Sequence, residues 1–103
     1  MISVIVTYQV KTEFVDQNKQ NIQRFLKDFK ELDTSDFQYN VYTKDDNVTF
    51  VHHSIYKNEK VQTELLNVPS FLEFQRIRDE SGLNGTHKVE VLKVVGSTNE
   101  KLV

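Results

Sequence analysis

Two adjacent histidines, His52 and His53, lie in an otherwise apolar stretch and are the residues best suited to acid–base chemistry. Imidazole titrates near neutral pH, so either side chain could act as a general base. Adjacent residues of a strand point to opposite faces of a sheet, so at most one of them can enter a given pocket. A histidine that is only hydrogen-bonded at a half-buried interface is the more common case. We predict that one of the two is a catalytic base.

Tyrosines and one arginine could hold the substrate of such a base. Tyr8 or Tyr56 could orient a substrate oxygen, although tyrosines more often serve as large core residues. Arg76 could hold an anionic group, and its spacing from Arg78 places the two on different sides of one helix. A pair between Arg76 and Glu80, four residues later, is the simpler role.

A metal site is not expected. His87 precedes the last predicted strand and is expected in a surface loop. Together with Asp45, Asp46 and the paired histidines, it has none of the ligand spacings that are typical of metal centres. The chain has no cysteine, which excludes disulfides and thiolate ligands and is compatible with a reducing compartment.

Composition limits the class of protein. The 103 residues suffice for one domain, residues 1–103. With 13 basic and 15 acidic residues interspersed, no basic stripe is available to bind nucleic acid. No apolar run approaches the roughly 20 residues that span a bilayer, and the first residues alternate like a strand rather than a signal peptide. We therefore expect a cytoplasmic protein without nucleic-acid or membrane partners.

The order of the predicted elements indicates an α+β fold. Alternating apolar residues predict strands, and three- and four-residue spacing predicts helices. Pro69 interrupts the second helix, and Gly82 is expected to close it in the left-handed conformation. The elements are a strand over 2–10, a helix over 13–32, strands over 37–43 and 48–56, a broken helix over 58–82, a strand marked by Val89, Val91 and Val95, and a flexible tail over 97–103.

This β-α-β-β-α-β order predicts a ferredoxin-like antiparallel sheet with two helices on one face. Two helices can cover only that face. The other face still carries apolar side chains, and we expect a second copy of the chain to cover it, giving a homodimer built sheet against sheet.

Several segments add a family resemblance to this pattern. They are Ile55-Tyr56 at the end of the third strand, the following Lys57-Asn58-Glu59, and the stretch 65–71 around Pro69. With the element order, they resemble the dimeric α/β-barrel superfamily and within it the antibiotic biosynthesis monooxygenase family. The resemblance implies a homodimeric α/β barrel with a pocket between sheet and helices. It also implies oxygenation of an aromatic or quinol-like small molecule without a cofactor. The substrate-binding residues that we expect are Tyr8, Thr7, Tyr56, Phe71, Phe74 and Arg76.

The chain departs from the family pattern at several positions. Tyr56 stands where the family usually has Trp, Ser54 where a Glu is frequent, and Ser70 where a His often follows the proline. Thr7 and Gln75 occupy the positions of an Asn and an axial His in haem-degrading relatives, so haem chemistry is not expected. Two alternatives therefore stay open: a non-catalytic small-ligand-binding or interaction dimer, and an isomerase or decyclase on the same fold.

Overall fold

The computed structural model describes residues 1–98, so most of the predicted tail lies outside the described residues. Within them the elements follow the predicted order. They are β1 (Ile2–Val10), a 3₁₀ turn (Thr12–Phe14), α1 (Val15–Phe29), β2 (Phe37–Thr43), β3 (Thr49–Tyr56), α2 (Glu59–Leu66), α3 (Pro69–Ile77), a π-helical turn (Arg78–Gly82) and β4 (Leu83–Leu92).

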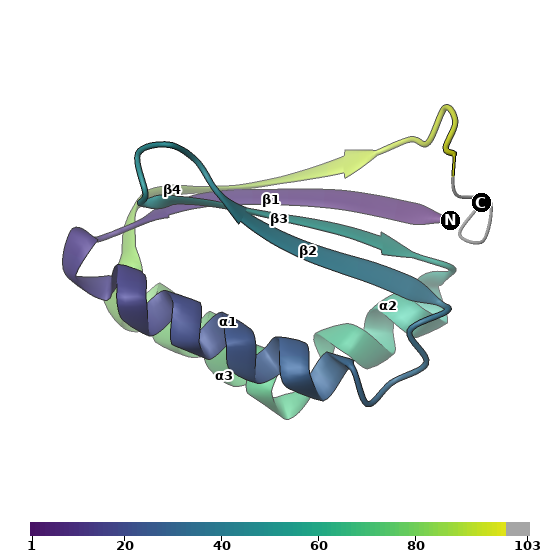
Figure 1. Cartoon of the computed structure of the whole chain (residues 1–103), viewed down its shortest axis with the longest axis horizontal. Helices are drawn as coiled ribbons and strands as arrows, with labels where there is room; N and C mark the ends of the chain where they lie inside the picture. The colour runs from purple at the N-terminus through teal and green to yellow at the C-terminus, as the bar shows by residue number, and fades with distance from the viewer. Residues whose placement is uncertain (99–103) are drawn as a thin grey trace.

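The four strands form one antiparallel sheet in the order β2-β3-β1-β4. The helices lie together on one face of the sheet, and the other face carries no helix (Figure 1). This arrangement confirms the predicted ferredoxin-like α+β fold. None of the helices in residues 1–98 is long and apolar enough to cross a membrane.

Local sequence explains where the second helical segment starts and breaks. The side chain of Asn58 accepts a hydrogen bond from the backbone N–H of Val61 at 3.0 Å, as expected of a helix cap. Pro69 begins α3 rather than kinking a longer helix, because its fixed φ and missing N–H suit the first helical position. The break lets α2 and α3 follow different directions over the sheet (Figure 1).

The core between helices and sheet is rich in aromatic rings. Phe25 of α1 is fully buried, and its ring centre lies 5.0 Å from that of Phe29, 5.0 Å from Phe71 and 4.9 Å from Phe74. Edge-to-face pairs of this kind add to the stabilisation from buried area. The cluster joins α1 to α3 and forms the wall against which the polar residues of β3 are packed.

Three predicted details were wrong. The last strand begins at Leu83 rather than near Val89, because residues 83–92 pair with β1 despite their weak strand pattern. Gly82 is not in the left-handed conformation; among the described glycines only Gly85 has a positive φ, of 93°. At residue 82 the reason for glycine is space, since a Cβ would lie 2.5 Å from the ring of Phe14. α1 ends at residue 29 instead of 32, because the N–H groups of Glu31 and Leu32 bond to carbonyl groups three residues earlier, as in a tighter 3₁₀ turn.

Candidate functional site

A cavity of about 220 Å³ lies between the helices and the sheet. Its walls are mostly apolar, and a few polar groups converge on it, which is the usual composition of a small-molecule site. The lining residues come from all four strands and from α2, α3 and the π-helical turn; the polar ones are Tyr39, His52, Ser54, Tyr56, Gln62, Gln75, Arg78 and His87.

His52 is the buried centre of this site. Its side chain points under the helices and is 3% exposed. Its Nε2 lies 2.7 Å from the hydroxyl of Tyr8, and its Nδ1 lies 2.7 Å from the hydroxyl of Tyr39. The Nδ2 group of Asn18, from α1, donates to the Tyr8 hydroxyl at 3.0 Å. Both ring nitrogens of His52 are therefore engaged, and the chain of hydrogen bonds reaches the accessible surface only at Tyr39.

Burial determines the charge of this network. It is the largest of the effects that together lower the pKa of His52 to about 3; the charge of Arg78, and that of His87 when His87 is protonated, act in the same direction. Burial also raises the pKa of the Tyr8 and Tyr39 hydroxyls well above the ordinary tyrosine value. The three groups are thus neutral at pH 7, and His52 donates from one nitrogen and accepts at the other.

Arg78 places a positive charge inside the site. Its side chain is 5% exposed, and its guanidinium carbon lies 4.9 Å from the ring centre of Tyr8 and 5.3 Å from that of Phe74. The Nε group donates to the carboxylate of Asp79 at 3.0 Å, but that carboxylate is 54% exposed. The ion pair therefore leaves the inner side of the guanidinium facing the aromatic rings and the cavity.

Some predicted site residues line this cavity and others do not. Tyr56, Phe71 and Phe74 line it. Tyr8 lies behind it, fully buried, and its hydroxyl is hydrogen-bonded to His52. Thr7 points to the opposite face of the sheet, because it alternates with Tyr8 along β1.

His53 also lies on the opposite face, as strand alternation required. Its Nε2 is 3.3 Å from the hydroxyl of Ser3. A second cavity, of about 280 Å³, lies beside it and is lined also by Met1, Gln38 and residues 92–97. This cavity is larger, but His53 is only half-buried there and Lys93, the charged residue in its lining, is exposed. The cavity under the helices is therefore the better candidate for chemistry.

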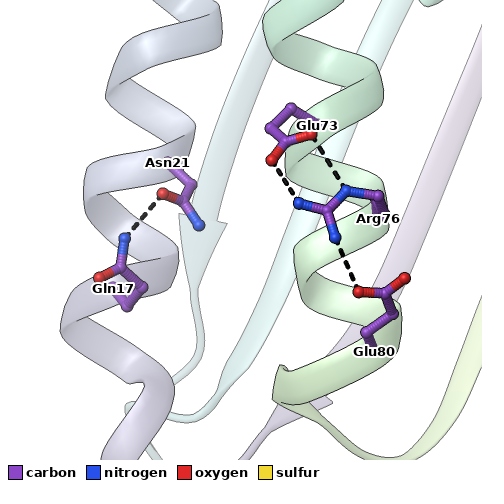
Figure 2. A network of polar contacts seen from close by, with 5 residues as sticks. All are labelled: Gln17, Asn21, Glu73, Arg76 and Glu80. Carbon is purple, nitrogen blue, oxygen red and sulfur yellow. Dashed lines mark hydrogen bonds and ion pairs between the residues drawn. The ribbon is translucent and has the colours of Figure 1, made fainter.

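The structure corrects the placement of Arg76. Figure 2 shows its guanidinium between Glu73 and Glu80 on the outer side of α3, where it bonds Glu73 at 3.1 Å and Glu80 at 2.7 Å. The predicted pair with Glu80 is confirmed, whereas the predicted position in the pocket is wrong. The arginine that enters the cavity is Arg78, two residues later.

His87 was wrongly expected in a surface loop. It lies in β4, opposite Tyr8 in the sheet, and its ring centre is 6.4 Å from that of Tyr8. The side chain is exposed at the edge of the cavity. In a strand, residues two positions apart point to the same face, so the position of His87 two residues before Val89 was the sequence signal that both side chains face the cavity.

Metal binding finds no support in the described residues. Within residues 1–98 no three His, Cys, Asp or Glu side chains are grouped as metal ligands. The site contains instead neutral hydrogen-bonding groups, one buried cation and aromatic walls.

Comparison with known proteins establishes the fold. No protein-family model and no curated protein matches the sequence. Solved structures do match. One is named antibiotic biosynthesis monooxygenase (12% identity, 93% of this chain and 100% of that chain covered, TM-score 0.79). A protein from Nitrosomonas europaea, provisionally named as the same enzyme, has 17% identity, coverages of 93% and 100%, and a TM-score of 0.79. Rv0793 from Mycobacterium tuberculosis has 16% identity, coverages of 95% and 98%, and a TM-score of 0.79. At these identities the likeness shows a shared fold.

Proposed function

We propose that this protein is a cofactor-independent monooxygenase acting on a quinol or a similar phenolic aromatic molecule. The observation that carries the proposal is the buried guanidinium of Arg78 in a mostly apolar cavity. A cation in such surroundings stabilises a phenolate far more than water-exposed charges do. The names of two structures that share the fold support an oxygenase.

The reaction needs only the substrate and O₂. A quinol loses a phenolic proton, and the resulting phenolate transfers one electron to O₂. The two radicals join at the neighbouring ring carbon, and the peroxide so formed takes up a proton. Loss of the proton from that carbon then breaks the O–O bond, forms a C=O group and expels hydroxide, which becomes water. Quinol and O₂ thus give hydroxyquinone and water, and the quinol supplies all four electrons.

Each wall of the cavity has a role in this proposal. Phe71 and Phe74 pack against the aromatic ring, and Arg78 holds the phenolate oxygen. Tyr39 offers its hydroxyl to a second substrate oxygen, while His52 fixes the direction of that hydroxyl. We assign His52 to positioning, because both its ring nitrogens are engaged and its pKa is low. His53, on the other face, has no part in this site.

One observation favours a second candidate, a non-catalytic protein that binds the same class of ligand. The engaged His52 has no free nitrogen for a substrate proton, which is also what a purely structural histidine would show. An isomerase or decyclase would in turn use the same cavity for proton transfer without consuming oxygen.

Oxygen consumption separates these functions. We expect the wild-type protein to consume O₂ with at least one member of a panel of benzo- and naphthoquinols, yielding one hydroxyquinone per O₂ above the rate of autoxidation. The heat-denatured protein is the control. Ligand-dependent thermal stabilisation without O₂ consumption would support the binding protein, and turnover under nitrogen would support the isomerase.

We also propose that the helix-free face of the sheet pairs with a second copy of the chain. Ile5, Val51 and Ile55 point to this face and are only half-buried in the single chain. Covering them would remove apolar surface from water. Sedimentation at micromolar concentration is expected to give a dimer, and a monomer would contradict this assembly.

A further inference from the structure

We propose that His87 is the general base of the cavity and takes the phenolic proton of the substrate. This inference rests on the oxygenase proposed above, which requires a proton acceptor and has none in the engaged His52. It assigns a catalytic role to a residue that the sequence pattern alone placed in a surface loop.

The position of His87 suits a base. β4 is the edge strand next to β1, and His87 stands opposite Tyr8 in that pairing. Its ring meets the Tyr8 ring edge-on, with 6.4 Å between centres and 67° between planes. The side chain lines the cavity and is also exposed to solvent. A proton can thus reach it from the substrate and leave it to water.

The ring nitrogens of His87 are available. None of the described side chains is hydrogen-bonded to them, whereas both nitrogens of His52 are occupied. A base must come within hydrogen-bond reach of the proton that it accepts. Of the two histidines that line the cavity, only His87 can offer a free nitrogen to a substrate hydroxyl.

The neighbouring charges favour the same assignment. Partial burial lowers the pKa of His87, the guanidinium of Arg78 lowers it further, and the carboxylate of Asp79 opposes them. The other titratable groups at the cavity are His52 and the tyrosines Tyr8, Tyr39 and Tyr56; the pKa of His52 is lowered and those of the tyrosines are raised by burial, so all four are neutral at pH 7. His87 is therefore unprotonated at pH 7 and ready to accept a proton.

Proton transfer to His87 creates charges that the site can accommodate. The phenolic O–H bond breaks, its electron pair stays on the oxygen, and the proton binds a ring nitrogen of His87. The phenolate then lies between the new imidazolium and the guanidinium of Arg78, and each cation stabilises it. Once O₂ has added to the substrate, the same proton can pass to the peroxide oxygen, which restores neutral His87.

The first test measures the base without oxygen. Under nitrogen, 1-naphthol is added to the wild-type protein, and the imidazole NMR signals of His87 are followed across pH; His53→Gln, on the other face, helps to assign them. We expect bound naphthol to raise the apparent pKa of His87 by at least one unit. Naphthol that binds without moving this pKa, or that does not bind at all, would overturn the proposal.

The second test measures turnover. His87→Gln is expected to lower kcat for quinol oxygenation about 100-fold, to leave the affinity for the product quinone unchanged, and to abolish the acid limb of the pH profile. His53→Gln should behave as wild type. In His87→Ala, added imidazole should restore part of the rate. Oxygenation by wild type that His87→Gln leaves intact would refute the base alone, whereas naphthol-linked titration of His87 without any O₂ consumption would refute the oxygenase alone.

Discussion

Lowering the pH from 6.5 towards 3 is expected to destabilise the fold by about 1.4 kcal/mol per pH unit through His52 alone. In the unfolded chain this histidine binds a proton below its ordinary pKa of 6.5, whereas in the folded protein burial lowers that pKa to about 3. Between these values the unfolded state binds one more proton than the folded state. Stability therefore rises with pH in this window and is lost as the pH falls.

Urea unfolding at several pH values measures this effect. His52→Gln serves as the reference, because an amide can hydrogen-bond to Tyr8 and Tyr39 but does not titrate. Asp33 and Asp46, whose carboxyl pKa values are lowered by hydrogen bonds from Ser35 and Thr49, respectively, also reduce stability in acid, but equally in both proteins. The difference between the two curves should therefore slope with pH. Parallel curves would show that His52 is not held neutral by burial.

Replacing Arg78 with Met should lower kcat/KM for quinol oxygenation by about two to three orders of magnitude, the loss typical of removing one donor to a developing oxyanion. The fold should persist, because a flexible apolar side chain can occupy the space over Tyr8 and Phe74. The substitution leaves no unpaired charge buried, because the carboxylate of Asp79 is 54% exposed and can be solvated. Steady-state oxygen consumption and a thermal melt measure the two quantities.

The chain supplies a matched control two residues away. Arg76 is exposed and bound to Glu73 and Glu80, so Arg76→Met should change the rate less than twofold and leave the melting temperature close to that of the wild type. Arg78→Lys should retain part of the activity, since it keeps the charge without the planar guanidinium. Equal losses in Arg76→Met and Arg78→Met would contradict a specific role for Arg78.

The fold was predictable because most of its elements carry their own periodicity. β1 and β3 alternate, α1 has its apolar residues on one side, and Asn58 and Pro69 mark helix starts. The separation of His52 from His53 followed from strand geometry alone. These features depend on a few neighbouring residues, so a single sequence contains them.

The site was less predictable because it depends on tertiary structure. Arg76 was predicted to hold the substrate, but helical spacing places Arg78, four residues after Phe74 and seven after Phe71, on the buried side of α3 and leaves Arg76 exposed. β4 begins early because pairing with β1 overrides a weak local pattern, and this brings His87 to the cavity. The chain from Asn18 through Tyr8 and His52 to Tyr39 joins one helix and three strands. No spacing in the sequence reveals such a connection.

The ionisation state of a bound phenol tests most directly whether this cavity holds an anionic substrate at Arg78. Under nitrogen at pH 7, 1-naphthol bound to the wild-type protein and to Arg76→Met should show the red-shifted absorption of naphtholate, and Arg78→Met should lose it. Naphthol that binds to the wild-type protein with the spectrum of the neutral phenol, or a naphtholate spectrum that persists without Arg78, would contradict the account.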